Sequence, residues 1–222
     1  MNTIEAMEKR HTVRKYTDKK ISGEILEMIK KRINELNKEY GLSMKLITEN
    51  KDAFGGFAKL FMTRGVRNYL ILAGNETNDL EEKLGYCGMD LALLAQQLGL
   101  NSWWVGGTFN KEKITNMMQA SFKGKVASIL ALGYGASNGK PHKSKNIEEV
   151  SEYKGTAPEW FVKGVQAALL APTAMNKQVF VLKGNGSKVA INCEHGVYTN
   201  IEKGIVKYCF EKGAGKENFE WA

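Results

Sequence analysis

Apolar side chains recur at helical spacing in several long stretches of the chain. These stretches are residues 22–41, 85–98, 160–170 and 201–212. Ser22 is a residue type that begins helices, and Gly41, Gly99 and Gly213 are of the type that ends them. The pattern therefore predicts four substantial helices, with a shorter one near residues 111–119.

Continuous apolar runs separate these helices. Residues 68–73 and 126–132 are apolar almost throughout, which is typical of strands buried on both faces. Shorter runs at 44–47, 103–105, 178–182 and 188–191 predict further strands. Gly55-Gly56 indicates a loop before a short helical stretch that ends near Arg64, and residues 136–155 are polar and basic and favour a linker. Alternating helices and short strands predict an α/β or α+β architecture.

The order of elements begins again after Pro158. Residues 25–47 match residues 160–182 in type and length, and the apolar spacing of 91–99 matches that of 205–213. We interpret this as a degenerate internal duplication within one domain of 222 residues. The first half is residues 1–150 and the shorter second half is residues 151–222.

Composition narrows the class of protein. A hydrophobic content of 43% and a charged content of 25% are typical of a globular domain. The most apolar run is too short to cross a membrane, and residues 1–10 do not have the pattern of a secretory signal, so we expect a cytoplasmic protein with no membrane partner. Cys87, Cys193 and Cys209 include no C-x-x-C pair, so we expect buried thiols and no metal site.

The net charge of +8 indicates an anionic partner, which could be nucleic acid or a phosphorylated cofactor. The basic residues are scattered and often stand beside glutamate, which favours a solvated surface over a nucleic-acid interface. No G-x-G-x-x-G or G-x-x-x-x-G-K-[ST] sequence occurs, so a Rossmann or P-loop site has no support.

A first candidate motif, Arg-His-Thr-Val-Arg, precedes the first long helix. Arg10, Thr12 and Arg14 alternate, so they would point the same way from an extended segment. Two guanidinium groups and a hydroxyl suit a phosphate monoester. An ordinary basic arm is the alternative for this motif taken alone.

A second candidate motif, Ala-Pro-Thr-Ala-Met-Asn-Lys-Gln at 171–178, lies between a predicted helix and a predicted strand. Pro172 would end the helix, and its small neighbours would let Thr173, Asn176, Gln178 and backbone amides approach a flat heterocycle. A loop with favourable turn residues is the alternative.

Together the motifs resemble the two signatures of the FMN-dependent nitroreductase family, R-x-[ST]-x-R-x-[YF] and A-P-[ST]-A-x-N-x-Q. Residues 88–107 look like that family's central helix and the strand after it, and Ala-Leu-Gly-Tyr-Gly at 131–135 looks like its closing strand end. The resemblance covers about residues 8–183 and is specific through the combination of motifs.

The resemblance implies an α+β fold with a central, mostly antiparallel sheet and flanking helices. It implies that Arg10, Thr12 and Arg14 hold the phosphate and ribityl chain of FMN, with Lys143 or Lys145 completing the phosphate site. It implies that the amides of Gly106 and Gly107 approach the flavin ring. The residues implied to line the ring are Pro172, Thr173, Ala174, Asn176 and Gln178. No catalytic acid or base follows from it.

One departure from the family pattern concerns spacing. In other members the second motif soon follows the first, and a homodimer builds each flavin site from both subunits. Here Arg14 and Ala171 are 157 positions apart, the counterpart of the second motif at 39–42 has lost its Pro, Thr and Asn, and the segment 148–153 contains no arginine. We interpret the chain as a fused pseudo-dimer with one flavin site, with a monomer favoured and a homodimer still open.

The function that this resemblance implies is transfer of electrons from NADH or NADPH through FMN to a small flat acceptor, such as a nitroaromatic compound or a quinone. Two alternatives stay open. One is a flavin-consuming or dehalogenating relative on the same fold, and the other is a flavin-binding protein that has lost turnover.

Overall fold

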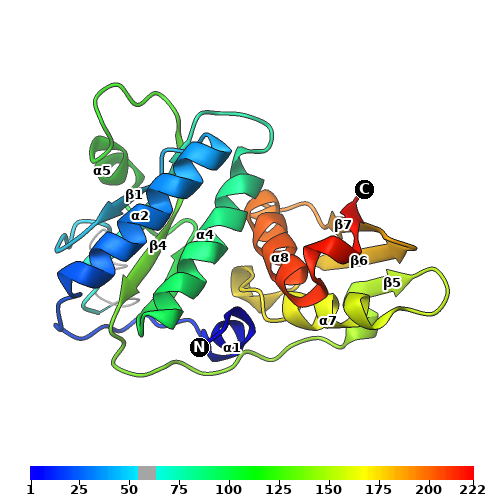
Figure 1. The fold of residues 1–222 in the computed structure, drawn as a ribbon. Helices are drawn as coiled ribbons and strands as arrows, with labels where there is room; N and C mark the ends of the chain where they lie inside the picture. The colour runs from blue at the N-terminus through cyan, green and yellow to red at the C-terminus, as the bar shows by residue number, and fades with distance from the viewer. Residues whose placement is uncertain (55–63) are drawn as a thin grey trace.

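The structure, a computed structural model, describes residues 1–54 and 64–222 (Figure 1). Two four-stranded sheets lie on either side of two helices, α4 (Leu80–Gln97) and α8 (Thr199–Ala214), which pack against each other. A short helix, α1 (Thr3–Lys9), packs against both and leads into the first motif. The short helical stretch expected after Gly55-Gly56 lies outside the described residues.

The first sheet contains strands β1 (Lys45–Ile47), β2 (Asn68–Gly74), β4 (Lys125–Gly133) and β3 (Asn101–Val105), in that order and all antiparallel. Every residue of β2 is buried, which confirms the prediction of a strand covered on both faces. Helices α2 (Gly23–Tyr40) and α4 cover one face (Figure 1). A second apolar cluster, near α5 (Lys111–Asn116), covers the other.

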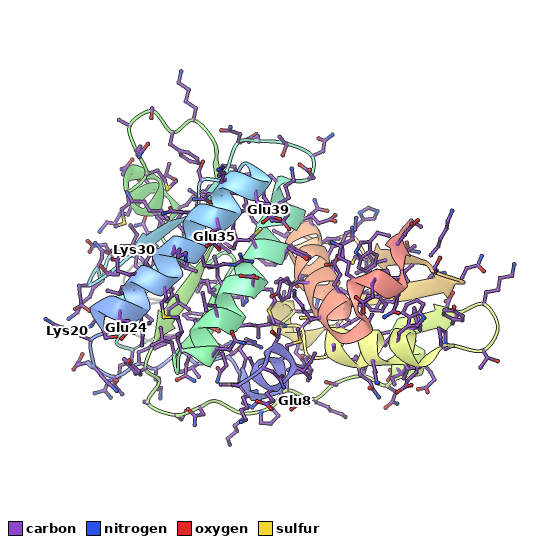
Figure 2. The ribbon with its side chains drawn as sticks, in the orientation of Figure 1. Glu8, Lys20, Glu24, Lys30, Glu35 and Glu39 are labelled. Carbon is purple, nitrogen blue, oxygen red and sulfur yellow. The ribbon has the colours of Figure 1, made fainter. Side chains whose placement is uncertain are left out.

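Helix α2 has the limits that the sequence predicts. The Ser22 hydroxyl accepts a hydrogen bond from the Ile25 N–H at 3.4 Å, and Gly41 ends the helix with a left-handed φ of 67°. Its buried side chains are Ile29, Ile33 and Leu36. Figure 2 shows the opposite, charged face, with labels at Glu24, Lys30, Glu35 and Glu39.

The second sheet has the strand order β5 (Ser151–Tyr153), β6 (Phe180–Asn185), β7 (Lys188–Cys193) and β8 (Glu220–Trp221). Strands β6 and β7 form an antiparallel hairpin, whereas β5 is parallel to β6 and β8 is parallel to β7. Helix α7 (Glu159–Ala168) packs against α8 beside this sheet. The structure confirms the predicted α+β class and antiparallel sheet and adds a second, mixed sheet.

The prediction of a linker over residues 136–155 was wrong for residues 147–153. A single-turn helix, α6 (Ile147–Val150), runs directly into β5. Asn146 and Glu149 form a capping box at its start, and Val150 is completely buried. These elements are too short to produce a periodic pattern, and β5 depends on pairing with a strand about 30 residues later in the chain.

The predicted stop at Gly213 was also wrong. Gly213 lies inside α8, and the residue that follows this helix with a positive φ is Gly215, at 76°. A Cβ atom on Gly213 would lie 2.5 Å from the Lys163 carbonyl oxygen of α7. This glycine therefore allows two helices to approach closely and does not end one.

Helices α4 and α8 cross through reciprocal glycine contacts. A side chain on Gly85 would collide with the carbonyl oxygen of Ile201, and a side chain on Gly204 would collide with that of Glu82. In each case the carbonyl belongs to the residue three positions before the opposing glycine. Contacts of this kind are those of a two-fold interface, in which each partner presents the same surface to the other.

The same register relates other elements of the two halves. Helices α4 and α8 begin at Leu80 and Thr199, and strands β3 and β8 begin at Asn101 and Glu220, each pair 119 positions apart. Strand β8 pairs directly with β7, whereas β4 separates β3 from β2, so the second half has no counterpart of β4. The sequence match of 91–99 with 205–213 spans 114 positions and is therefore displaced by five residues from this register.

Candidate functional site

A pocket with an empty volume of about 640 Å³, part of it open to solvent, lies between the first half and the second half of the chain. The first half contributes Thr12, Arg14, Trp103, Trp104, Gly106 and Ser128. The second half contributes Pro172, Thr173, Ala174, Met175, Tyr198, Ile201, Glu202 and Ile205. The predicted residues Thr12, Arg14, Gly106, Pro172, Thr173 and Ala174 are thus brought together from both motifs.

The first motif lies along β3 as an extended segment. The Val13 N–H donates to the Ser102 carbonyl oxygen at 3.1 Å, and Val13 is buried, so its neighbours Thr12 and Arg14 are both directed to the pocket. The Arg14 guanidinium lies over the Trp103 ring, 5.4 Å from its centroid. Stacking on a ring holds the guanidinium in place while leaving its N–H donors available to an anion.

Arg10 does not line the pocket. Its side chain is buried beside Tyr16 and Cys209, and its Nε and Nη1 atoms have no hydrogen-bond partner among the residues that the structure describes. Burial lowers the pKa of the Arg10 guanidinium and raises the pKa of the Cys209 thiol to about 12, so the thiol stays neutral. A buried cation is costly when it has no ion-pair partner, and Arg10 has none among the described residues, so an anion bound nearby would stabilise it.

The second motif has an unusual backbone. After the short 3₁₀ turn Ala174–Asn176 begins, Met175, Asn176 and Gln178 all have positive φ values, of 50°, 56° and 49°. Side chains disfavour this region, so such a run persists only where surrounding contacts hold it. One such contact is the Ala174 N–H, which donates to the Glu202 carboxylate of α8.

Asn176 and Gln178, which the resemblance places at the flavin ring, do not line the pocket in this structure. The Asn176 amide donates to the Lys143 carbonyl oxygen at 2.7 Å, and Gln178 is buried and bonded to Lys145. Lys143 and Lys145 likewise lie outside the pocket lining. These four residues join the chain segment after β4 to the second motif.

Gly106 lines the pocket, and Gly107 lies beside it, with Tyr198 covering both. A Cβ atom on Gly106 would lie 2.5 Å from the Tyr198 ring, and one on Gly107 would lie 2.6 Å from its hydroxyl oxygen. Glycine is therefore required at both positions for Tyr198 to pack as it does.

Several pocket residues were not predicted from the sequence. Ser128 and Trp104 line the pocket, and the Ser128 hydroxyl and Trp104 Nε1 have no partner among the described residues. Tyr198 immediately precedes α8, and Glu202 lies in the first turn of that helix. Burial raises the pKa of the Glu202 carboxyl, opposed by the Ala174 N–H and by Lys177. No sequence signal distinguished these two, because polar residues near a helix start are common on any surface, and both lie beyond residue 183, where the resemblance ends.

The fold and the motifs together define a nitroreductase-type protein. Residues 2–214 match the family model described as "Putative TM nitroreductase". The chain therefore belongs to this nitroreductase family. No curated protein matches the sequence.

Solved structures show the same fold. A nitroreductase-like protein from Thermotoga maritima is 22% identical with a TM-score of 0.62, and the match covers 96% of this chain and 85% of that one. A nitroreductase-like protein from Desulfovibrio desulfuricans, in complex with FMN, is 17% identical with a TM-score of 0.53, covering 68% and 95%. A protein from Parabacteroides distasonis, named for NADH dehydrogenase or NAD(P)H nitroreductase activity, is 16% identical with a TM-score of 0.52, covering 68% and 97%.

These coverages differ in a consistent way. The Thermotoga maritima structure matches almost all of this chain, whereas the other two match about two thirds of it while using nearly their whole length. This chain is therefore about two fifths longer than those two proteins. Among the helices described, none combines the length and the apolar content needed to span a membrane.

Proposed function

We propose that this chain binds one FMN in the pocket between its halves and transfers electrons from NADH or NADPH to a small flat acceptor such as a nitroaromatic compound or a quinone. The observation that carries the proposal is the meeting of Thr12 and Arg14 with Pro172, Thr173 and Ala174 around one pocket. The two motifs that resemble the family's flavin-binding signatures are far apart in sequence, and the fold joins them within a single chain.

The pocket residues fit the chemistry of FMN. Arg14 and the Thr12 hydroxyl supply donors of the kind that bind phosphate. Arg10 lies outside the lining, but its Nε and Nη1 atoms have no partner among the described residues and suit an anion. The Ser128 hydroxyl and Trp104 Nε1 also line the pocket, have no partner among the described residues and suit the carbonyl oxygens of a flavin ring. FMN, when bound, supplies the redox chemistry by accepting hydride and passing electrons on.

The protein's own residues would bind, orient and exclude water. Residues 172–174 of the second motif supply one wall of the pocket, and Glu202 holds that wall through the Ala174 N–H. Trp103, Ile201 and Ile205 supply apolar walls that keep bulk water from a ligand in the pocket. No side-chain nucleophile is needed for this chemistry.

The electron donor is proposed from the name of a related structure. The Parabacteroides distasonis protein is named for NADH dehydrogenase or NAD(P)H nitroreductase activity. We carry that activity class over to this chain as part of the proposal and leave the choice between NADH and NADPH to experiment.

The test is direct. Purified protein incubated with FMN and freed of excess should have a flavin absorbance spectrum that NADH or NADPH bleaches without oxygen, and a quinone or nitroaromatic compound should restore it. Denaturation should release close to one FMN per chain. A chain that retains no flavin would contradict the proposal, and a chain that retains flavin but is not bleached by either nucleotide would contradict its donor.

A further inference from the structure

The start of α8 forms the second-half wall of the pocket. Tyr198, Ile201, Glu202 and Ile205 all line it, at the spacing of one helix face. Glu202 is the only carboxylate among the lining residues. This wall has no counterpart in the two motifs that resemble the family's flavin-binding signatures.

Among the described residues, no ion pair neutralises the charge of Glu202. Its carboxylate accepts the Ala174 N–H, and within the described parts of the chain no lysine or arginine forms a salt bridge with it. Lys177 is near enough to oppose the rise in the pKa of Glu202, but it forms no direct contact of that kind. Arg14 lines the same pocket from the first half, where the proposed function assigns it to the FMN phosphate.

The surroundings of this carboxylate strengthen its effect on a ligand. Aromatic and aliphatic side chains make up much of the lining around it, and the Glu202 side chain is only partly accessible. In such a partly desolvated space the effective dielectric constant is far below that of water, so a charge acts strongly over the width of one aromatic ring.

We propose that Glu202 selects acceptors by charge, admitting neutral or cationic flat molecules and rejecting anionic ones. This inference rests on the proposed function, because it concerns the acceptor that shares the pocket with FMN. An acceptor that enters this pocket shares it with Tyr198, Ile201, Glu202 and Ile205, which all line it. A carboxylate or sulfonate on that molecule would be repelled, whereas a carbonyl, amide or nitro group would not.

The test compares two probes that are alike in size and differ in charge, 4-nitrobenzamide and 4-nitrobenzoate. Glu202→Gln removes the charge and keeps an oxygen that accepts the Ala174 N–H. We expect this substitution to raise kcat/KM for 4-nitrobenzoate about tenfold relative to 4-nitrobenzamide. Glu194→Gln is the matched control, since Glu194 is exposed, lies outside the pocket lining and undergoes the same change of charge.

Binding gives a second measurement that does not depend on turnover. Benzoate and benzamide are not reduced, and their dissociation constants can be measured through the fluorescence of Trp103 and Trp104, which line the pocket. Glu202→Gln should tighten benzoate binding about tenfold and change benzamide binding less than about twofold. Should the Gln variant fail to fold, Glu202→Met makes the same comparison with a side chain of similar length.

The outcomes separate the two proposals. If Glu202→Gln changes both probes equally, or changes neither, charge selection is wrong even when the enzyme is bleached and turns over. If neither the unsubstituted protein nor any variant binds FMN, the proposed flavin function is wrong. If Glu202→Gln still raises the affinity for benzoate and not for benzamide, the effect of the Glu202 charge is supported all the same.

Discussion

Gln178 holds Lys145 at two points. The Gln178 side-chain carbonyl oxygen accepts the Lys145 backbone N–H at 2.8 Å, and the Gln178 backbone carbonyl oxygen accepts the Lys145 ammonium group at 3.1 Å. The remaining amide donor of Gln178 reaches the Leu169 carbonyl oxygen at 3.0 Å. Gln178 therefore joins the segment after β4, which contains Lys145, to the second motif.

Gln178→Ala should destabilise the protein by about 1–3 kcal/mol, because it leaves the Lys145 N–H and the Leu169 carbonyl oxygen without this partner. Urea unfolding of the two proteins measures the difference. Asn176→Ala is the matched comparison, since Asn176 is more exposed and its amide makes one bond to the segment, and it should cost less than about 1 kcal/mol. Equal losses would mean that burial of Gln178 does not matter.

Arg10 and Arg14 should respond differently to substitution. Arg14→Ala should weaken FMN binding by about 1.5–3 kcal/mol and leave the stability of the free protein nearly unchanged, because Arg14 is exposed. Arg10→Met removes a buried cation with two nitrogens that have no partner among the described residues, so the free protein should be as stable or more stable while FMN binding weakens.

Riboflavin is the control for both arginine variants. It lacks the phosphate, so both should bind it about as well as the unsubstituted protein does. Fluorescence titration measures each affinity. An Arg10→Met protein with unchanged FMN affinity would show that Arg10 serves only the fold.

The α4–α8 crossing should tolerate no added side chain. Gly85→Ala places a methyl group against the Ile201 carbonyl oxygen, which must move, so we expect a loss of about 1–3 kcal/mol in the free energy of unfolding. Gly23→Ala, at the start of α2, is the control because nothing lies within 4 Å of its Cβ position. A Gly85→Ala protein as stable as Gly23→Ala would show that the helices separate at little cost.

The crossing should also weaken in acid. Burial by itself would raise the pKa of Glu82, but bonds from Lys203 and Lys207 of α8 outweigh it and hold that pKa below its usual value of 4.5. A carboxyl with a lowered folded-state pKa contributes stability above its unfolded pKa, and the contribution is lost as pH falls through the folded value. Glu82→Gln should therefore reduce stability at pH 7, and the difference from the unsubstituted protein should vanish once the pH falls below the lowered folded-state pKa, as measured by urea unfolding at each pH. A difference that is constant with pH would exclude this linkage.

A single chain should form the flavin site without exchanging halves. Arg14→Ala removes a donor from the first-half wall, and Ala174→Phe fills space at the second-half wall. Unfolding the two variants together and refolding them should recover no FMN binding beyond that of each alone. Recovery of about a quarter of the sites, the fraction expected when two chains share sites at random, would instead indicate a dimer with exchanged halves.

The sequence predicted best those features that depend on neighbouring residues. Ser22 and Gly41 delimit α2 through contacts within one or two turns, and the apolar run of β2 identifies a buried strand by itself. The two motifs were recognisable because each is a short segment with fixed spacing. The prediction that the two motifs share one pocket came from interpreting the second half of the chain as the equivalent of a partner subunit.

The features that were missed depend on residues far apart in the chain. Strand β5 exists because it pairs with β6, and Gly213 approaches α7, so neither could be read from local pattern. Gln178 looked like a ring contact because its motif resembles the family's, yet the fold places Lys145 beside it. In the sequence, Glu202 looks like any other polar residue on a helix, because its contact with the second motif appears only in the fold.

The ion pairs at the crossing of α4 and α8 are not repeated at the positions that the pseudo-two-fold relationship makes equivalent. Applying the 119-residue register, the equivalent of Glu82 is Ile201, and the equivalents of Lys203 and Lys207 are Leu84 and Gly88. In a homodimer each mutation appears in both subunits, on both sides of the two-fold axis. A substituted residue must therefore be compatible with the same substitution in the partner subunit. In one continuous chain, a mutation in one half is not repeated in the other half. Glu82 therefore forms ion pairs across the crossing, whereas its equivalent, Ile201, lines the pocket.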